Sequence, residues 1–218
     1  MPNLHGFWYH FVDLNNGSRR DSSEVSTVDS ALFILGALQA GEYFRATYPE
    51  IAAKVGEYKA LLDKELAVEL GSTVVELDSR KASVRGMETA MGNLVADGMR
   101  KAVGADVAIT NGGGIRGDKT YAAGSKLTRK DILTELPFGN KTLLLELTGA
   151  QIKEALENGV SQIDKGAGRF PQVSGLAFAV ETAKPVGERV SAIMVNGKPL
   201  DLAAAYKVAT NDFMARGG

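Results

Sequence analysis

The 218-residue sequence lacks cysteine altogether and contains only two histidines, His5 and His10, both near the N-terminus. Without thiols the chain can form neither disulfides nor cysteine-based zinc sites, and it has no thiolate nucleophile. From residue 11 onward no imidazole can serve as a metal ligand or as a general base. These absences restrict the possible chemistry more than any other feature of the composition.

The sequence also lacks an excess of charge. Its formal net charge is −1, which implies no general attraction to nucleic acid or to an anionic membrane. It has no apolar run of about 18 residues, so we expect no membrane span. The first ten residues lack the basic and aliphatic regions of a signal peptide, so nothing in them indicates export. What is present, 44% hydrophobic and 23% charged residues, is typical of a globular domain.

The character of the chain changes near residue 50. Residues 1–49 contain the only tryptophan and an apolar run that predicts a helix over residues 27–45. Because this helix would be apolar nearly all round, it needs neighbouring helices that so short a segment cannot supply. We therefore expect a partial helical segment over residues 1–49, followed by a mixed α/β domain over residues 51–218.

The elements expected in the second segment follow from apolar periodicity and from capping residues. Thr128 and Asp131 are spaced as a capping box, and Asn196-Gly197 favours a two-residue type I′ hairpin turn. Helices are predicted over residues 51–70, 88–103, 128–135 and 149–160. Strands are predicted over residues 73–77, 106–110, 141–147, 178–181, 190–195 and 206–210.

A glycine-rich loop, Asn111-Gly-Gly-Gly-Ile-Arg116, follows the predicted strand 106–110. Glycines leave the backbone N–H groups unshielded by side chains, so the main chain can approach an anion closely. Arg116 adds a planar guanidinium that can bind phosphate or carboxylate through two hydrogen bonds. The loop therefore predicts an anion site.

Three interpretations of this loop compete. Gly112, Gly114 and Gly117 fit the Gly-x-Gly-x-x-Gly pattern of dinucleotide-binding proteins, but that motif must open a helix and residues 118–125 are turn-like. A Walker A loop would need its lysine directly after Gly117, where Asp118 stands instead. The third interpretation is a tight turn that carries a surface arginine.

Residues 107–116 resemble the signature of the C-terminal domain of the 5′-nucleotidases, a family that includes the UDP-sugar hydrolases. Further blocks follow the family's order and extend the resemblance over residues 51–218. They are Val84-Arg85 before Glu88-Thr-Ala-Met-Gly-Asn93, then Leu136-Pro-Phe-Gly-Asn140, Thr148-Gly149 and Thr210-Asn-Asp-Phe-Met-Ala-Arg-Gly-Gly218.

The resemblance implies a substrate-recognition domain with a 5′-nucleotidase-like mixed sheet and helices. It implies that Phe138 and Phe213 stack on the base, and that Asn140 hydrogen-bonds the base or ribose. The phosphate would be met by a basic and glycine-rich group that comprises Lys81, Arg85, Asn111, Gly113, Gly114 and Arg116. The expected ligand is a nucleoside or nucleotide, with neither nucleic acid nor a membrane as partner.

In this family a separate N-terminal metallophosphoesterase domain holds two divalent metals and performs the hydrolysis. Such a site needs a cluster of Asp, His and Asn ligands, and residues 1–49 contain no Asp-x-His pair or Gly-Asn-His run. We therefore expect no catalytic residue, metal ligand or cofactor in this chain. A metallophosphoesterase domain from a neighbouring chain is a candidate partner. Family members are typically periplasmic or extracellular.

The sequence departs from the family at three places. Met87 and Ala90 stand where many members have arginine and asparagine. The chain ends at Gly218, where the family continues with an aspartate that contacts the substrate. We therefore expect weak ligand binding and a poorly anchored Phe213.

Residues 4–48 resemble a stretch of the glucoamylase-like family of helical-toroid glycoside hydrolases, in Gly6-Phe-Trp-Tyr-His-Phe-Val-Asp13 and Ser23-Glu-Val-Ser-Thr-Val-Asp-Ser-Ala-Leu32. Glycosidic chemistry uses a pair of carboxylates, for which Glu24 and Asp29 are the local candidates. The same residues also fit a first-turn helix carboxylate and a surface charge. Two partial families in one chain indicate a fusion or a misassembled reading frame. The alternatives are a relic of a glycoside hydrolase and a free-standing nucleotide-binding module.

Overall fold

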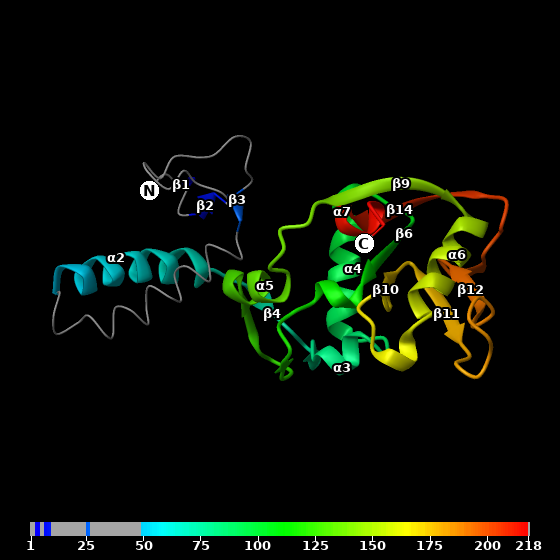
Figure 1. Ribbon diagram of the computed structural model, residues 1–218, viewed down its shortest axis with the longest axis horizontal. Helices are drawn as coiled ribbons and strands as arrows, with labels where there is room; N and C mark the ends of the chain where they lie inside the picture. The colour runs from blue at the N-terminus through cyan, green and yellow to red at the C-terminus, as the bar shows by residue number, and fades with distance from the viewer. Residues whose placement is uncertain (1–2, 5–6, 10–24, 27–48, 218) are drawn as a thin grey trace. The chain divides into compact units, whose positions relative to one another are not determined.

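The computed structural model describes residues 3–4, 7–9, 25–26 and 49–217 (Figure 1). The helix expected over residues 27–45, both histidines, Glu24 and Asp29 lie outside the described residues. Near the N-terminus the structure has one antiparallel sheet of short strands: β1 (Asn3–Leu4), β2 (Phe7–Tyr9) and β3 (Val25–Ser26). Among the described residues, no helix has the length and apolar character that a membrane span requires.

The chain divides into two compact units. The first contains the described residues up to 71, together with residues 126–133 and 137–139. The second contains residues 72–125 and 134–136 and the described residues from 140 onward.

The first unit contains a helix, a two-stranded sheet and most of a second helix: α2 (Pro49–Leu66), β4 (Glu69–Ser72) with β8 (Lys126–Thr128), and α5 (Arg129–Glu135). An exposed ion pair of 2.9 Å joins Lys126 to Glu69 across the sheet. At the start of α5 the Asp131 carboxylate accepts the N–H of Thr128 at 2.9 Å, and the Thr128 hydroxyl accepts the N–H of Asp131 at 3.3 Å. The predicted capping box is confirmed.

The second unit is built on a four-stranded sheet, in the order β10 (Pro171–Ser174), β6 (Val107–Asn111), β14 (Ala205–Asn211) and β9 (Thr142–Thr148). β14 runs parallel to β6, whereas β10 and β9 pair antiparallel with their neighbours. A mixed sheet with helices on its faces confirms the α/β class expected from the sequence.

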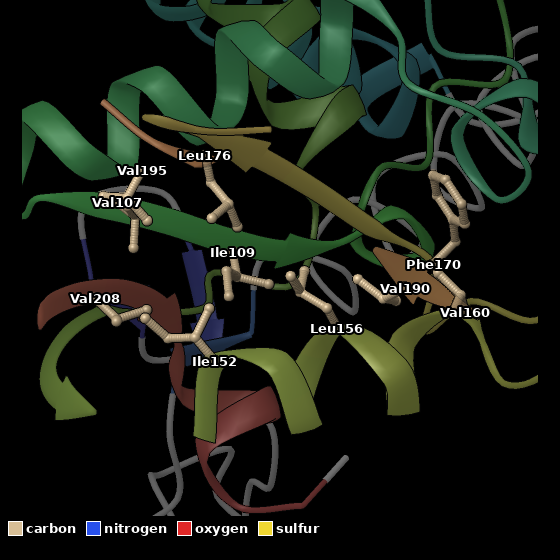
Figure 2. Close-up of a cluster of buried hydrophobic side chains, with 10 residues drawn as sticks. All are labelled: Val107, Ile109, Ile152, Leu156, Val160, Phe170, Leu176, Val190, Val195 and Val208. Atoms are coloured by element: carbon tan, nitrogen blue, oxygen red, sulfur yellow. The ribbon is translucent and has the colours of Figure 1, made fainter. Parts of the chain in front are cut away.

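Successive side chains of a strand point to opposite faces of the sheet, so alternate residues of β6 pack against different helices. Val107 and Ile109 of β6 join the apolar cluster with α6 (Gly149–Val160), whereas Ala108 between them packs with α4 (Ala90–Val103). Both faces are covered, so β6 is apolar on both sides. Figure 2 shows the larger cluster, made of Val107, Ile109, Ile152, Leu156, Val160, Phe170, Leu176, Val190, Val195 and Val208.

An antiparallel sheet also packs on α6, and it comprises β11 (Leu176–Val180), β12 (Val190–Val195) and β13 (Lys198–Pro199). Asn196 and Gly197 connect β12 to β13 with φ values of 47° and 79°. Positive φ at both residues is what a type I′ turn requires, so this prediction is confirmed.

A buried carboxylate fixes β12 to α6. Glu157 is 7% exposed and accepts hydrogen bonds from the N–H groups of Arg189 at 3.0 Å and Val190 at 2.8 Å. The Arg189 guanidinium donates to the Val160 carbonyl at 3.2 Å and to the Asp164 carboxylate at 2.9 Å. The charges gathered here are therefore hydrogen-bonded, as buried charges must be.

The strand expected over residues 73–77 is wrong. Instead, β4 ends at Ser72, and β5 (Leu77–Asp78) pairs with β7 (Thr120–Tyr121). Between β4 and β5, the Thr73 hydroxyl accepts the N–H of Val75 at 3.3 Å, and Val74 is 89% exposed. A side-chain hydrogen bond bends the chain here, so the β-branched run has no partner strand.

The helix boundaries follow the capping residues. Thr89 accepts the N–H of Gly92 at 3.0 Å, so α4 begins at Ala90 rather than at the expected Glu88. Thr148 and Gln151 form a capping box at the start of α6, which spans the predicted range. The first helix of the segment ends at Leu66, four residues before the expected end.

Candidate functional site

The glycine-rich loop turns its backbone toward the protein. β6 leads into a single 3-10 turn, η1 (Gly112–Gly114). The N–H of Gly112 donates to the Phe170 carbonyl at 2.7 Å, and the N–H of Gly113 donates to the Gly168 carbonyl at 2.7 Å. These two amides are occupied, so an anion at this loop would be held mainly by neighbouring side chains.

Close packing explains why glycines stand here. A Cβ on Gly112 would lie 1.8 Å from the Val84 carbonyl oxygen, and one on Gly113 would lie 2.8 Å from Gly168 Cα. Backbone atoms cannot easily move aside, so a side chain at either position would separate the segments that meet at the loop. No helix opens after the loop, because β7 follows at Thr120. The dinucleotide-binding interpretation lacks the helix that it requires.

Arg85 lies beside the close contact between Gly113 and Gly168. Its Cζ atom is 3.7 Å from the position that a Cβ on Gly168 would take, and Gly113 Cα is 3.1 Å from the same position. The Arg85 Nε atom is buried and has no hydrogen-bond partner among the described residues. A guanidinium nitrogen in this state is a donor in need of an acceptor. The structure therefore brings together Arg85 and Gly113, two of the residues predicted to meet phosphate.

A buried glutamine supports the backbone around Arg85. Gln172 of β10 is fully buried. Its side-chain amide donates to the carbonyls of Val84 at 3.0 Å and Met87 at 2.8 Å, on either side of Arg85. Its oxygen accepts the N–H of Thr89 at 3.3 Å. All of these bonds hold the loop between α3 (Lys81–Val84) and α4 against the central sheet.

An ion pair fixes the other end of α3. Asp78 accepts hydrogen bonds from Arg80 Nε at 3.0 Å, from Arg80 Nη2 at 2.7 Å and from the Ser83 hydroxyl at 2.7 Å. The bonds from Arg80 are the main reason that the pKa of Asp78 lies well below its usual range. The exposed Lys81 donates its backbone N–H to Asp118 at 2.7 Å, which connects α3 to the chain after the glycine loop.

Asn111 is joined to the segment that carries Phe213. Its side-chain oxygen accepts the Asn211 amide at 2.9 Å, and the same amide group lies 3.2 Å from the Thr110 hydroxyl. The Asn211 oxygen accepts the N–H of Met214 at 2.8 Å and so caps the short helix α7 (Asp212–Ala215). Phe213 projects from this capped turn and is 51% exposed.

Asn140 lies next to the same turn. Lys141 donates its N–H to the Asp212 carboxylate at 3.1 Å, and Asp212 donates its N–H to the Lys141 carbonyl at 3.0 Å. Asn140 and Phe213 are the chain neighbours of these two residues, and Asn140 is exposed. The structure thus brings Asn111, Asn140 and Phe213 to one end of β9 and β14.

Two predicted residues are less closely defined by the structure. The exposed Arg116 reaches back with Nη1 to the Gly113 carbonyl at 3.5 Å, the outer limit of a hydrogen bond. Phe138 is 51% exposed and belongs to the first compact unit. Its pairing with Phe213 on a base stays a prediction.

The supporting residues were missed by reasoning from the sequence. Gln172 and Asn211 carry amides inside buried strands, and Glu135 is a carboxylate only 1% exposed. A polar residue in an apolar run is the one signal that could have marked Gln172. Within the described part of the chain, no group of three or more His, Cys, Asp or Glu side chains could hold a metal ion.

Comparison with known proteins gives the family. The family model described as 5′-nucleotidase, C-terminal domain, matches residues 69–218. This chain belongs to that family. The Rossmann-like and Walker A interpretations of the glycine loop are thereby set aside, and the resemblance drawn from the sequence over this region is confirmed.

The matches to related proteins cover most of this chain but only a smaller part of each relative. The trifunctional nucleotide phosphoesterase protein YfkN of Bacillus subtilis is 39% identical over 181 residues, which cover 78% of this chain and 12% of that protein. The 5′-nucleotidase of Homo sapiens is 31% identical over 188 residues, which cover 78% of this chain and 33% of that protein. The chain thus spans one third or less of these relatives.

A solved structure gives the same result. The crystal structure of a 5′-nucleotidase precursor from Thermus thermophilus is 38% identical, with a TM-score of 0.67, and the match covers 78% of this chain and 34% of that chain. The match confirms the fold class.

Proposed function

We propose that the 5′-nucleotidase C-terminal domain of this chain recognises the nucleoside or nucleotide substrate of a phosphomonoester hydrolase. The hydrolysis and its two divalent metals are assigned to a metallophosphoesterase domain outside the residues described here. The described side chains offer no cluster that fits such metals, so their contribution is to bind and orient the ligand.

Arg85 is the observation that carries this proposal. Its Nε atom is buried without an acceptor among the described residues, beside the close contact of Gly113 and Gly168. An unsatisfied donor on a cation costs stability, and a phosphate oxygen would satisfy it with a charge-assisted hydrogen bond. The proposed phosphate group consists of Lys81, Arg85, Asn111, Gly114 and Arg116, whereas Gly113, whose N–H donates to the Gly168 carbonyl, contributes close packing beside Arg85.

Phe213 and Phe138 are the proposed stacking residues for the base. Both rings are 51% exposed, although large aromatic side chains are usually buried. The Asn211 cap holds the turn that carries Phe213, so its ring is presented from a fixed backbone. Asn140, beside that turn, supplies an amide for the base or ribose, and flat ligands are favoured by stacking on a ring face.

Calorimetric titration of the full chain with AMP and with adenosine tests this proposal. Arg85→Ala should weaken AMP binding about tenfold or more and leave adenosine binding nearly unchanged, since a charge-assisted hydrogen bond contributes about 1.5–3 kcal/mol. Phe213→Ala and Phe138→Ala should weaken both ligands, because stacking does not involve the phosphate.

Lys184→Ala is the matched control, because it removes an exposed positive charge that pairs with Glu181 on the β11–β12 connection. It should change neither affinity. Equal loss of AMP affinity in Lys184→Ala and Arg85→Ala would contradict the assignment of Arg85. Binding of β-glucan oligosaccharides instead of nucleotides would favour the glycoside hydrolase relic.

A further inference from the structure

A buried carboxylate lies behind the Arg116 loop. Glu135, the last residue of α5, is 1% exposed. Its Oε1 atom accepts hydrogen bonds from the Ser79 hydroxyl at 2.9 Å and the Tyr121 hydroxyl at 2.8 Å. Its Oε2 atom accepts the N–H of Gly117 at 3.0 Å. Both oxygens are therefore satisfied, which a buried carboxylate requires.

The same residue also holds the preceding amide of the loop. The N–H of Arg116 donates to the Glu135 carbonyl at 2.9 Å. Two successive amides, on either side of the Arg116 Cα atom, thus end on Glu135. Because these bonds restrict the two backbone dihedral angles of Arg116, they fix the direction in which its side chain leaves the loop.

Gly117 leaves the space that the Glu135 carboxylate occupies. A Cβ on Gly117 would lie 2.0 Å from Glu135 Oε1 and 2.5 Å from Oε2. Only glycine permits the carboxylate to come this close to the loop. The last glycine of the Gly-x-Gly-x-x-Gly pattern therefore has a structural role that does not involve a dinucleotide.

The carboxylate reaches the Arg85 segment as well. Ser79, which donates to Glu135, also exchanges hydrogen bonds with Lys119: the N–H of Ser79 donates to the Lys119 carbonyl at 2.9 Å, and the N–H of Lys119 donates to the Ser79 hydroxyl at 3.2 Å. Ser79 stands two residues before α3, at whose end Arg85 lies. Glu135 is thus joined to both arginine-bearing segments.

We propose that Glu135 is a positioning residue for phosphate recognition, which sets the backbone of Arg116 and, through Ser79, the segment of Arg85. The inference rests on the proposed function above. Glu135 does not touch the ligand in this scheme, so its substitution should affect the phosphate contribution to binding more than the nucleoside contribution.

The test compares two buried glutamates of the same unit by calorimetric titration with AMP and adenosine. Glu135→Gln should weaken AMP binding about tenfold, which corresponds to about 1.4 kcal/mol, and should change adenosine binding less than about twofold. Glu157→Gln is the matched control, since Glu157 is 7% exposed and accepts two backbone N–H groups away from the loop. It should lower the Tm and leave the ratio of AMP to adenosine affinity unchanged.

Gly117→Ala attacks the same contact from the opposite side. Its added Cβ displaces the Glu135 carboxylate, so it should lower the AMP affinity like Glu135→Gln, and the double variant should be no weaker than either single one. If these variants do not fold, Tyr121→Phe removes a single donor to Glu135 and should lower AMP affinity about threefold.

The outcomes separate this inference from the proposed function. An unchanged ratio of AMP to adenosine affinity in the folded variants, or an equal change in Glu157→Gln, would overturn the role of Glu135. A wild-type chain that binds AMP no more tightly than adenosine would overturn the proposed phosphate group, and this inference with it, whereas a chain that binds neither ligand would overturn the proposed function.

Discussion

At the scale of single residues, the second unit depends on a few buried or half-buried polar side chains that each make several hydrogen bonds. Gln172 bonds to the backbone before and after Arg85, Asn211 connects Asn111 to the Phe213 turn, and Asp78 fixes the start of α3. Of the proposed binding side chains, Arg116 and Phe213 are exposed. We expect the supporting residues to position these side chains without touching the ligand.

The depressed pKa of Asp78 predicts how the stability of the fold depends on pH. Its pKa is depressed in the folded chain by Arg80 and Ser83, so the folded state binds this proton less readily than the unfolded state. The stability that Asp78 provides is present above its unfolded pKa, about 3.9, and is lost as the pH falls through the folded pKa. Asp78→Asn should lower the Tm at pH 7, and the difference from wild type should shrink below about pH 4.

Thermal unfolding followed by circular dichroism from pH 7 to pH 2.5 measures this difference. Asp164→Asn is the comparison, since Asp164 is 60% exposed in its ion pair with Arg189 and should contribute little. A Tm difference for Asp78→Asn that stays constant across the acid range would show that the carboxylate's charge does not matter.

At the scale of elements, the sequence correctly predicted features that depend on residues close together in the chain. Thr128 with Asp131 and Thr148 with Gln151 mark helix starts because capping bonds form between residues three apart. The 73–77 strand failed because a strand needs a partner, and nothing local reveals that Val74 and Val75 have none. The order β10-β6-β14-β9 likewise depends on pairings between residues far apart in the chain.

The candidate site likewise combines features that the sequence predicted with features that only the folded chain shows. The blocks that resemble the 5′-nucleotidases supplied its proposed residues, and the structure brings several of them together. The function of the glycines was not predictable from composition. The sequence indicates unshielded N–H groups in the loop, whereas in the structure Gly112 and Gly113 donate to carbonyls and make room for Val84 and Gly168. Only the folded chain shows which segments press against the loop.

Alanine at two glycines of the second unit, Gly112 and Gly98, should have opposite effects on the stability of the fold. Gly112→Ala places a Cβ 1.8 Å from the Val84 carbonyl oxygen, which should destabilise the fold by about 1–3 kcal/mol, the usual cost of overpacking a core. Gly98 lies on the exposed side of α4 with no atom within 4 Å of an added Cβ. Gly98→Ala should stabilise the chain by about 0.5–1 kcal/mol through helix propensity.

Chemical denaturation gives both values on one scale, provided that the slopes of the two transitions agree with wild type. A neutral Gly112→Ala would mean that α3 and η1 separate freely, and close packing would then not explain the glycine.

At the scale of the whole molecule, the chain corresponds to one part of its longer relatives. Most of its described structure is a 5′-nucleotidase C-terminal domain, and the matches cover 12% of the Bacillus subtilis relative and 33% of the human relative. Two-metal hydrolysis requires several ligands that bridge both ions and hold the attacking water. The sequence has no cysteine, and its only histidines are His5 and His10. Under the proposed function, recognition belongs to this domain and hydrolysis to a domain outside the described residues.

The last prediction follows from this separation. The chain, incubated with AMP and with Mg²⁺, Mn²⁺ or Zn²⁺, should bind the nucleotide and release no phosphate above the level of buffer, because binding without a metal-activated water lowers no hydrolytic barrier. A malachite-green assay beside the calorimetric titration measures both properties on one sample. Phosphate release that needs metal, stops with EDTA and is lost in the His5→Ala/His10→Ala variant would mean that the N-terminal segment contributes a catalytic metal site.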